Sequence, residues 1–278
     1  MQKEIDYQKV KDTFEHIAGH KQQADLTLTA TSCPDDPPGF LQYRDRTQKR
    51  HLFKVLKFNR QWQILDMGCG AGRWSLAFAR KARFVIGVDN SPALLKIAEN
   101  QARRLSVSNV KFIESSIIDF SYPERFDLVF IGGVLLYIND DELSQLTTKF
   151  KDLLKPEGKL VLLESISTKE RIVKTDSYEK HLQIPYSAIY RRSDDYKVLC
   201  EKEGFRLEYE NDTMARNVPI FMYRKLAAGK LKKNRIVLAI LRLGFRLQAF
   251  LDPYLLKFGR FQNRAETHQR FFIFKYSG

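Results

Sequence analysis

The stretch that decides the fold is ILDMGCGAGR, residues 64–73, in which an apolar run leads into three closely spaced glycines. The pattern predicts a buried strand, a tight loop and the start of a helix. Gly68, Gly70 and Gly72 let the backbone turn and approach a ligand where a Cβ would collide. Because a helix start also offers free N–H groups, the loop predicts a site for a nucleotide-containing cofactor.

The spacing of these glycines separates two classes of cofactor. A dinucleotide fingerprint requires its third glycine at position 73, which is Arg73, so NAD is disfavoured. The run 65–72, with Asp66 two residues before Gly68, instead resembles the cofactor loop of class I S-adenosylmethionine-dependent methyltransferases. The resemblance implies S-adenosyl-L-methionine as cofactor and S-adenosyl-L-homocysteine as its product. Asp66 and the three glycines are then cofactor-binding residues.

A second acidic residue follows the next predicted strand. Residues 83–88 form an apolar run that ends in Asp89 and Asn90, after which Ser91 can cap a helix and Pro92 can open it. A carboxylate at a strand tip about 20 residues beyond a glycine loop can accept both hydroxyls of a ribose. We therefore expect Asp89 and Asn90 to bind the cofactor.

Length and composition fit one large α/β domain with elaborations, since the chain has 278 residues. No run of 18 apolar residues occurs, and the N-terminus lacks the apolar core of a secretion signal, so we expect a cytoplasmic protein. The three cysteines, Cys33, Cys69 and Cys200, lack the paired spacing of a zinc site. No metal is expected.

Strand and helix alternate from residue 62 onward with short connections, which is typical of a doubly wound α/β sheet. The family resemblance implies seven strands, mostly parallel, with the last strand antiparallel between the fifth and the sixth. We expect strands at about 62–67, 84–88, 110–114, 126–131, 158–164, 205–210 and 270–276, and helices near 73–81, 92–104, 141–154 and 194–203.

The flanking segments divide the chain further. Residues 1–60 are expected to form an N-terminal helical cap, with helices at about 6–18 and 41–57, and residues 61–278 the methyltransferase domain. Within that domain, 165–192 should be a loop and a short helix over the rim of the sheet. Because the sixth and seventh strands lie more than 50 residues apart, 215–265 is predicted to be a helical insertion.

Two further segments resemble motifs of the same family. Residues 110–119 resemble the third motif, which places Ser116 and the Ile117 N–H at the adenine. Residues 126–137 resemble the fourth motif, which places Gly132 at the methionine part of the cofactor. Tyr137 can face the adenine, face the acceptor or serve packing alone, and it is taken as a candidate for acceptor binding.

Methyl transfer to a hydroxyl benefits from a general base, and the candidates are Glu164, His20 and His181. Glu164 ends the predicted fifth strand, at the expected active-site edge of the sheet. His20 lies in the N-terminal cap, and His181 lies in the segment 165–192 over the rim. Further side chains near the predicted mouth are candidates for holding an anionic acceptor. They are Arg44, Arg46, Tyr190 and Arg191.

The basic charge of the chain is concentrated in one segment. The net charge is +14, and residues 216–264 hold twelve Lys or Arg and a single acid, Asp252, which accounts for +11. In a helix, four of these cations form one stripe on an otherwise apolar surface: Lys232, Arg235, Arg242 and Arg246. Three interpretations of segment 230–258 remain open. It can lie on an anionic membrane surface, at the inner face of the membrane, it can hold a lipid-linked or phosphorylated acceptor, or it can pack on the domain with solvated arginines.

The combined features predict an S-adenosylmethionine-dependent methyltransferase that O-methylates a small-molecule, glycan or lipid-linked acceptor. One alternative is a nucleic-acid (RNA) methyltransferase, and another is a non-catalytic regulatory protein that binds the cofactor. Nucleic acid ranks last among the partners, because the basic segment contains no recognisable nucleic-acid module.

Overall fold

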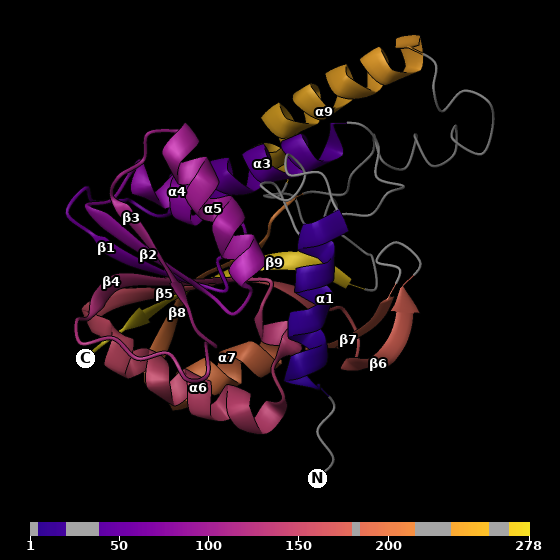
Figure 1. Cartoon of the computed structure of the whole chain (residues 1–278). Helices are drawn as coiled ribbons and strands as arrows, with labels where there is room; N and C mark the ends of the chain where they lie inside the picture. The colour runs from indigo at the N-terminus through magenta and orange to yellow at the C-terminus, as the bar shows by residue number, and fades with distance from the viewer. Residues whose placement is uncertain (1–4, 21–38, 180–183, 215–234, 256–266) are drawn as a thin grey trace.

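The structure is a computed structural model that describes residues 5–20, 39–179, 184–214, 235–255 and 267–278. It is built on a seven-stranded sheet with helices on both faces (Figure 1). The strand order is β3-β2-β1-β4-β5-β9-β8. The strands are β1 (Gln63–Met67), β2 (Phe84–Asp89), β3 (Val110–Glu114), β4 (Phe126–Gly132), β5 (Leu154–Ser167), β8 (Phe205–Asp212) and β9 (Thr267–Tyr276).

The topology confirms the predicted doubly wound sheet. Strands β1 to β5 pair in parallel, whereas β9 pairs antiparallel with both β5 and β8. The last strand therefore lies between the fifth and sixth predicted strands, as expected. Because parallel strands point the same way, the carboxyl ends of β1, β2, β4 and β5 share one edge, where ligands bind in this class of sheet.

The helices divide between the two faces of the sheet, as Figure 1 shows, with α3, α4 and α5 on one side and α6 and α7 on the other. The chain begins with α1, which packs against α5 and β7. The helix bounds are α1 (Tyr7–His20), α3 (Phe40–Val55), α4 (Ser75–Ala79), α5 (Pro92–Arg104), α6 (Asp140–Leu153) and α7 (Ser193–Lys202). The predicted cap of α5 is present, since the Leu94 N–H donates to Ser91 Oγ at 3.1 Å.

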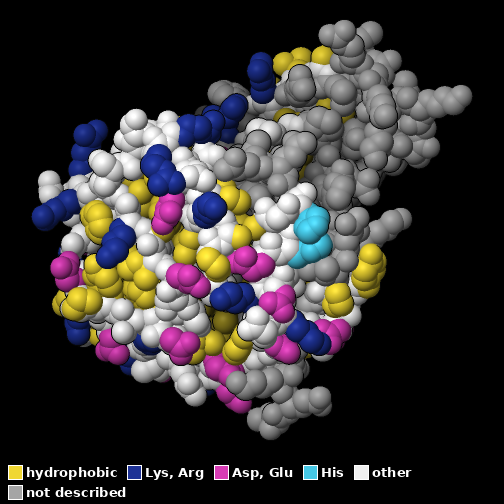
Figure 2. Space-filling model, in the orientation of Figure 1, with side chains coloured by type: hydrophobic (Ala, Val, Ile, Leu, Met, Phe, Trp, Pro, Cys, Tyr) yellow, Lys and Arg dark blue, Asp and Glu magenta, His cyan; other side chains and the backbone are white. Residues whose placement is uncertain are grey.

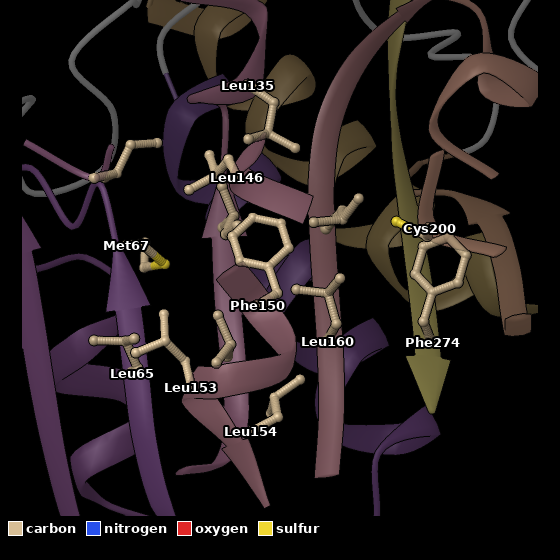
Figure 3. Packing of buried hydrophobic residues seen from close by; sticks show 14 of the residues in the cluster. Leu65, Met67, Leu135, Leu146, Phe150, Leu153, Leu154, Leu160, Cys200 and Phe274 are labelled. Carbon is tan, nitrogen blue, oxygen red and sulfur yellow. The ribbon is translucent and has the colours of Figure 1, made fainter. Parts of the chain in front are cut away.

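Both faces of the central strands are buried, which explains why they are continuous apolar runs. In β1, Leu65 and Met67 point to the face covered by α6 and α7, and Ile64 points to the opposite face. Figure 3 shows the first of these cores, in which Leu65 and Met67 lie beside Leu146 and Phe150 of α6.

The prediction for residues 165–192 was wrong. This segment extends β5 to Ser167 and then forms an antiparallel hairpin of β6 (Ile172–Glu179) and β7 (Ile184–Tyr190). The physical reason is burial of part of β7, because Tyr186 and Ala188 pack against α1 and Tyr137. These two positions lie two residues apart and so point to the same face of a strand.

The predicted insertion is described only over α9 (Arg235–Leu255). Among the residues of the predicted basic stripe, Lys232 lies outside the described residues, and Arg246 is the one whose side chain is described. None of the described helices combines the length and apolarity required to cross a bilayer.

Candidate functional site

A cavity of about 190 Å³ opens at the carboxyl edge of the sheet. Its walls come from the loops after β1, β2, β3 and β4, and from α1, which contributes Tyr7, Val10 and Phe14. Of the residues predicted from sequence to bind the cofactor, all except Gly72 line this cavity. They are Asp66, Gly68, Gly70, Asp89, Asn90, Ser116, Ile117 and Gly132.

The glycine loop between β1 and α4 turns with positive φ at Gly68, Gly70 and Gly72. A Cβ on Gly68 would lie 2.2 Å from Cγ2 of Val134, which belongs to the turn after β4. A Cβ on Gly72 would lie 3.0 Å from the Ala98 Cβ of α5. Gly72 therefore permits helix packing behind the cavity, while Gly68 and Gly70 form its wall.

We expect Gly68→Ala to lower the free energy of unfolding by about 3 kcal/mol, because left-handed strain and the clash with Val134 add together. Gly204→Ala is the matched control, since Gly204 also has positive φ but no atom would contact its Cβ. This control should cost about 1 kcal/mol in urea unfolding. Equal losses in the two variants would show that the contact with Val134 contributes nothing.

Asp89 lies at the tip of β2 with both carboxylate oxygens directed by the backbone. The Gly70 N–H donates to Oδ2 at 2.8 Å, and the Ser91 N–H donates to Oδ1 at 3.0 Å. Burial raises the pKa of Asp89, although these backbone donors oppose the shift. Each oxygen retains acceptor capacity toward the cavity, which fits the two hydroxyls of a ribose.

Asp66 lies at the tip of β1 and is 1% exposed. Burial raises its pKa to about 7, although the Ser75 hydroxyl donates to Oδ2 at 2.5 Å. A cationic ligand in the cavity would favour the ionised carboxylate, whereas a pyrophosphate would meet two acidic side chains. The carboxyl group of Asp66, beside the glycine loop, therefore fits a cationic sulfonium or ammonium group better than a pyrophosphate.

Ser116 and Ile117 form the wall at the end of β3. Ser116 Oγ accepts a hydrogen bond from the Ile118 N–H at 3.1 Å, so its own O–H remains available as a donor toward the cavity. Ile117 is buried and contributes an apolar surface. This combination suits a flat heterocycle such as adenine.

At the end of the cavity near α3, the structure adds polar residues that the sequence did not single out. Arg73 lines the cavity, and its Nε donates to Asp45 Oδ1 at 2.7 Å while its Nη2 donates to Gln48. The Gln48 side chain in turn donates to Gln269 Oε1 at 2.7 Å, and Gln269 of β9 also lines the cavity.

Trp74 also lines this end of the cavity. Its indole ring lies under the Arg73 guanidinium, with 5.1 Å from Cζ to the ring centroid. The buried Nε1 has no hydrogen-bond partner within the described part of the chain, although Trp74 lines the cavity. The Arg73 guanidinium therefore suits an anionic or carbonyl oxygen of a bound molecule.

Tyr137 lines the cavity from the short 3₁₀ turn η1 (Leu135–Tyr137). Its hydroxyl lies 3.3 Å from that of Tyr186, which lies 3.1 Å from that of Tyr190. Burial raises the pKa of both Tyr137 and Tyr186, so these two side chains stay protonated near neutral pH. Tyr190 thus belongs to a chain of hydroxyls that starts at the cavity.

Glu164 and Arg191 form hydrogen bonds to the backbone in and beside the η1 turn, and neither residue lines the cavity. Glu164 is fully buried, and its Oε1 accepts the N–H groups of Val134 and Leu135, each at 3.1 Å. Arg191 is 1% exposed and donates to the carbonyls of Leu135 and Ile138. Both residues therefore hold this turn in position, and their roles as a base and as an acceptor contact stay predictions.

The other predicted site residues lie away from the cavity wall or outside the described residues. His20 is exposed at the end of α1, where its ring stacks on His16 with centroids 4.0 Å apart. His181 lies outside the described residues. On α3, Arg46 is exposed and the Arg44 guanidinium lies over the Phe40 ring. Their catalytic or acceptor-binding roles stay predictions.

Within the described ranges, no group of three or more His, Cys, Asp or Glu side chains is placed to hold a metal ion. The thiols of Cys69 and Cys200 are buried and reduced, and Cys33 lies outside the described residues.

Comparison with known proteins gives the same family as the motifs. Residues 64–158 match the family model described as methyltransferase domain. The chain is 30% identical over 137 residues to carboxy-S-adenosyl-L-methionine synthase of Wolinella succinogenes, covering 48% of this chain and 54% of that protein. It is 26% identical over 162 residues to demethylmenaquinone methyltransferase of a Geobacillus strain, covering 57% and 63%. The chain thus spans between about half and two thirds of the length of these two relatives.

Solved structures support the fold. Geranyl diphosphate C-methyltransferase from Streptomyces coelicolor, in complex with S-adenosyl-L-homocysteine, superposes with a TM-score of 0.56 over 84% of this chain and 80% of its own. The two sequences are 14% identical, so the likeness concerns the fold.

Proposed function

The chain carries a class I S-adenosylmethionine-dependent methyltransferase domain, and from this premise we propose that it is an enzyme that methylates a small-molecule acceptor. The observation that carries the proposal is the cavity itself, where Asp66 and Asp89 occupy neighbouring strand tips beside the glycine loop. Asp89 would hold the ribose, Ser116 and Ile117 the adenine, and Gly132 the methionine end. The cofactor, when bound, supplies an activated methyl group.

The residues of this chain then contribute position and shielding. Displacement at a methyl carbon requires the acceptor atom about 3 Å away and in line with the breaking bond. Tyr137 lines the cavity together with Gly132 and Gly133, and α1 adds Tyr7 and Phe14 to its wall. The hydroxyl of Tyr137 would orient the acceptor, while Arg73 would hold an oxygen of the cofactor or the acceptor.

For the acceptor we propose a hydroxyl group, on a small molecule or on a glycan or lipid-linked compound. The relative named demethylmenaquinone methyltransferase supports a small-molecule acceptor by analogy. The basic segment 230–258 suits an enzyme in the cytoplasm that works at the inner face of the membrane. These finer assignments are part of the proposal.

The test combines binding and turnover. Isothermal titration should show S-adenosyl-L-homocysteine binding at one site per chain. Incubation with S-adenosyl-L-methionine and cell extract separated into lipid, glycan, RNA and small-molecule pools should then release S-adenosyl-L-homocysteine. Release with the RNA pool alone would support the nucleic-acid alternative, and binding without release in any pool would support a regulatory protein.

A further inference from the structure

Helix α9 is held on the domain by one well-defined face. Leu241 and Phe245 of α9 pack against Phe40 and Tyr43 of α3, and the Phe245 and Tyr43 rings stack with centroids 5.2 Å apart. The Tyr43 hydroxyl donates to Oδ2 of the buried Asp252 at 2.5 Å. The orientation of α9 about its own axis is therefore fixed by packing and by a buried hydrogen bond.

The opposite side of α9 presents large apolar side chains to solvent. Ile240, Leu243 and Leu247 are 61%, 67% and 59% exposed, and Leu251 is 37% exposed. At about 100° per residue, these four side chains fall within about 80° of one another around the helix. We call them the outer stripe of α9. Figure 2 shows hydrophobic side chains in yellow at the top of the molecule, where α9 lies in Figure 1.

A contiguous exposed apolar stripe is typical of a surface that binds another protein or a membrane. The net charge of the segment that contains α9 favours an anionic membrane, because residues 216–264 carry +11 of the chain's +14. Arg246, one helical position before Leu247, is exposed and lies to one side of the stripe. An apolar stripe flanked by basic residues is the pattern of a helix that lies in a bilayer interface.

We propose that the outer stripe of α9 docks on an anionic lipid bilayer. A second copy of this chain carries the same net charge of +14, which opposes self-association through α9. Anionic headgroups instead neutralise the basic segment while the bilayer interface covers the stripe. The inference concerns binding alone and stands independently of the proposed reaction.

The same packing links the docking surface to the cavity. Tyr43 holds α9, and the next turns of α3 carry Asp45 and Gln48, whose side chains hold Arg73 at the cavity wall. If the proposed function holds, docking through α9 places the α3 side of the cavity near the membrane. This arrangement suits an acceptor that is delivered from the lipid phase.

The experiment is co-sedimentation of the full chain with vesicles of phosphatidylcholine, with and without phosphatidylglycerol, at low and high salt. The native chain should pellet with the anionic vesicles at low salt, less at high salt, and little with phosphatidylcholine alone. The double substitution L243Q and L247Q should weaken this binding by at least about tenfold, because it removes two inserted side chains and leaves the charge unchanged.

The control is Val198→Gln on α7, where an apolar side chain 49% exposed lies outside the stripe, and its vesicle binding should match that of the native chain. Analytical ultracentrifugation and titration with S-adenosyl-L-homocysteine should give the same mass and affinity for all variants.

Absence of pelleting by the native chain, or equal pelleting by the double variant, overturns the proposal. A native dimer that the double substitution dissociates would also overturn it, by assigning the stripe to a second copy. If the native chain does not bind S-adenosyl-L-homocysteine but does pellet with anionic vesicles, the result counts against the proposed function and leaves the docking proposal standing.

Discussion

Asp89→Ala should weaken binding of S-adenosyl-L-homocysteine by about 100-fold, because two hydrogen bonds from ribose hydroxyls to a buried carboxylate would be lost. Titration calorimetry measures this loss. Methylthioadenosine keeps the ribose and adenine but lacks the amino acid group, so its affinity should fall by the same factor. A loss confined to S-adenosyl-L-homocysteine would place Asp89 at the amino acid end of the ligand instead.

Two further variants separate the ribose contact from local structure. Asp89 also accepts the N–H groups of Gly70 and Ser91, so its removal can disturb the glycine loop. Asp89→Asn keeps one carbonyl oxygen for these donors and should show an intermediate loss of affinity. Asp119→Ala is the control, because Asp119 is exposed one loop away and does not line the cavity. Full affinity in Asp89→Ala would contradict the ribose assignment.

The cofactor side of the cavity was predictable because its residues are close together in the sequence. Gly68 and Asp89 follow two successive strands, and parallel pairing of β1 with β2 brings the ends of both strands to one edge. The ribose contact of Asp89 was predicted from residue type and spacing, whereas the roles of Ser116, Ile117 and Gly132 were implied by the resemblance to the family's motifs.

The opposite side of the cavity depends on pairings that no local pattern reveals. Gln269 reaches the cavity because β9 returns more than 100 residues after β5 and pairs with it, Gln269 opposite Ser165. Arg73 was read only as the absence of a glycine, yet the side chains of Asp45 and Gln48 on α3 direct it to the cavity. Neither the position of Gln269 nor the partners of Arg73 can be predicted from the residues next to them in the sequence.

Side-chain direction also escaped the sequence analysis at Glu164 and Arg191. The prediction correctly put Glu164 at the active-site end of β5, but the turn after β4 lies over it and uses its carboxylate. An arginine is expected to be solvated by default, whereas Arg191 is almost fully buried. Both departures have one cause, which is the need of η1 for hydrogen-bond partners.

Arg191→Met should lower the free energy of unfolding by about 3 kcal/mol, because the buried carbonyls of Leu135 and Ile138 lose their donor. The ion pair with Asp140 adds little, since that carboxylate is 57% exposed. Urea unfolding at pH 7 measures the loss. Arg192→Met is the matched control, because Arg192 is exposed and pairs with Asp195 on the surface, and it should change stability by less than about 1 kcal/mol.

The loss in Arg191→Met should also grow with pH, and Glu164 is the reason. Burial raises the pKa of Glu164 to about 7, while the positive charge of Arg191 restrains the rise. An acid with a raised pKa in the folded state favours folding most below its ordinary pKa, and this advantage disappears as pH rises toward the folded-state pKa. Without Arg191 the folded-state pKa of Glu164 rises further.

At pH 5 Glu164 is protonated in the native chain and in Arg191→Met, so the loss in free energy of unfolding comes from the missing hydrogen bonds alone. At pH 8 the variant must also bury a carboxylate without its cation. If the pKa rises by one, this adds about 1 kcal/mol at pH 8 and approaches about 1.4 kcal/mol only at higher pH. An equal loss at pH 5 and pH 8 would show that Arg191 holds the turn through its hydrogen bonds alone.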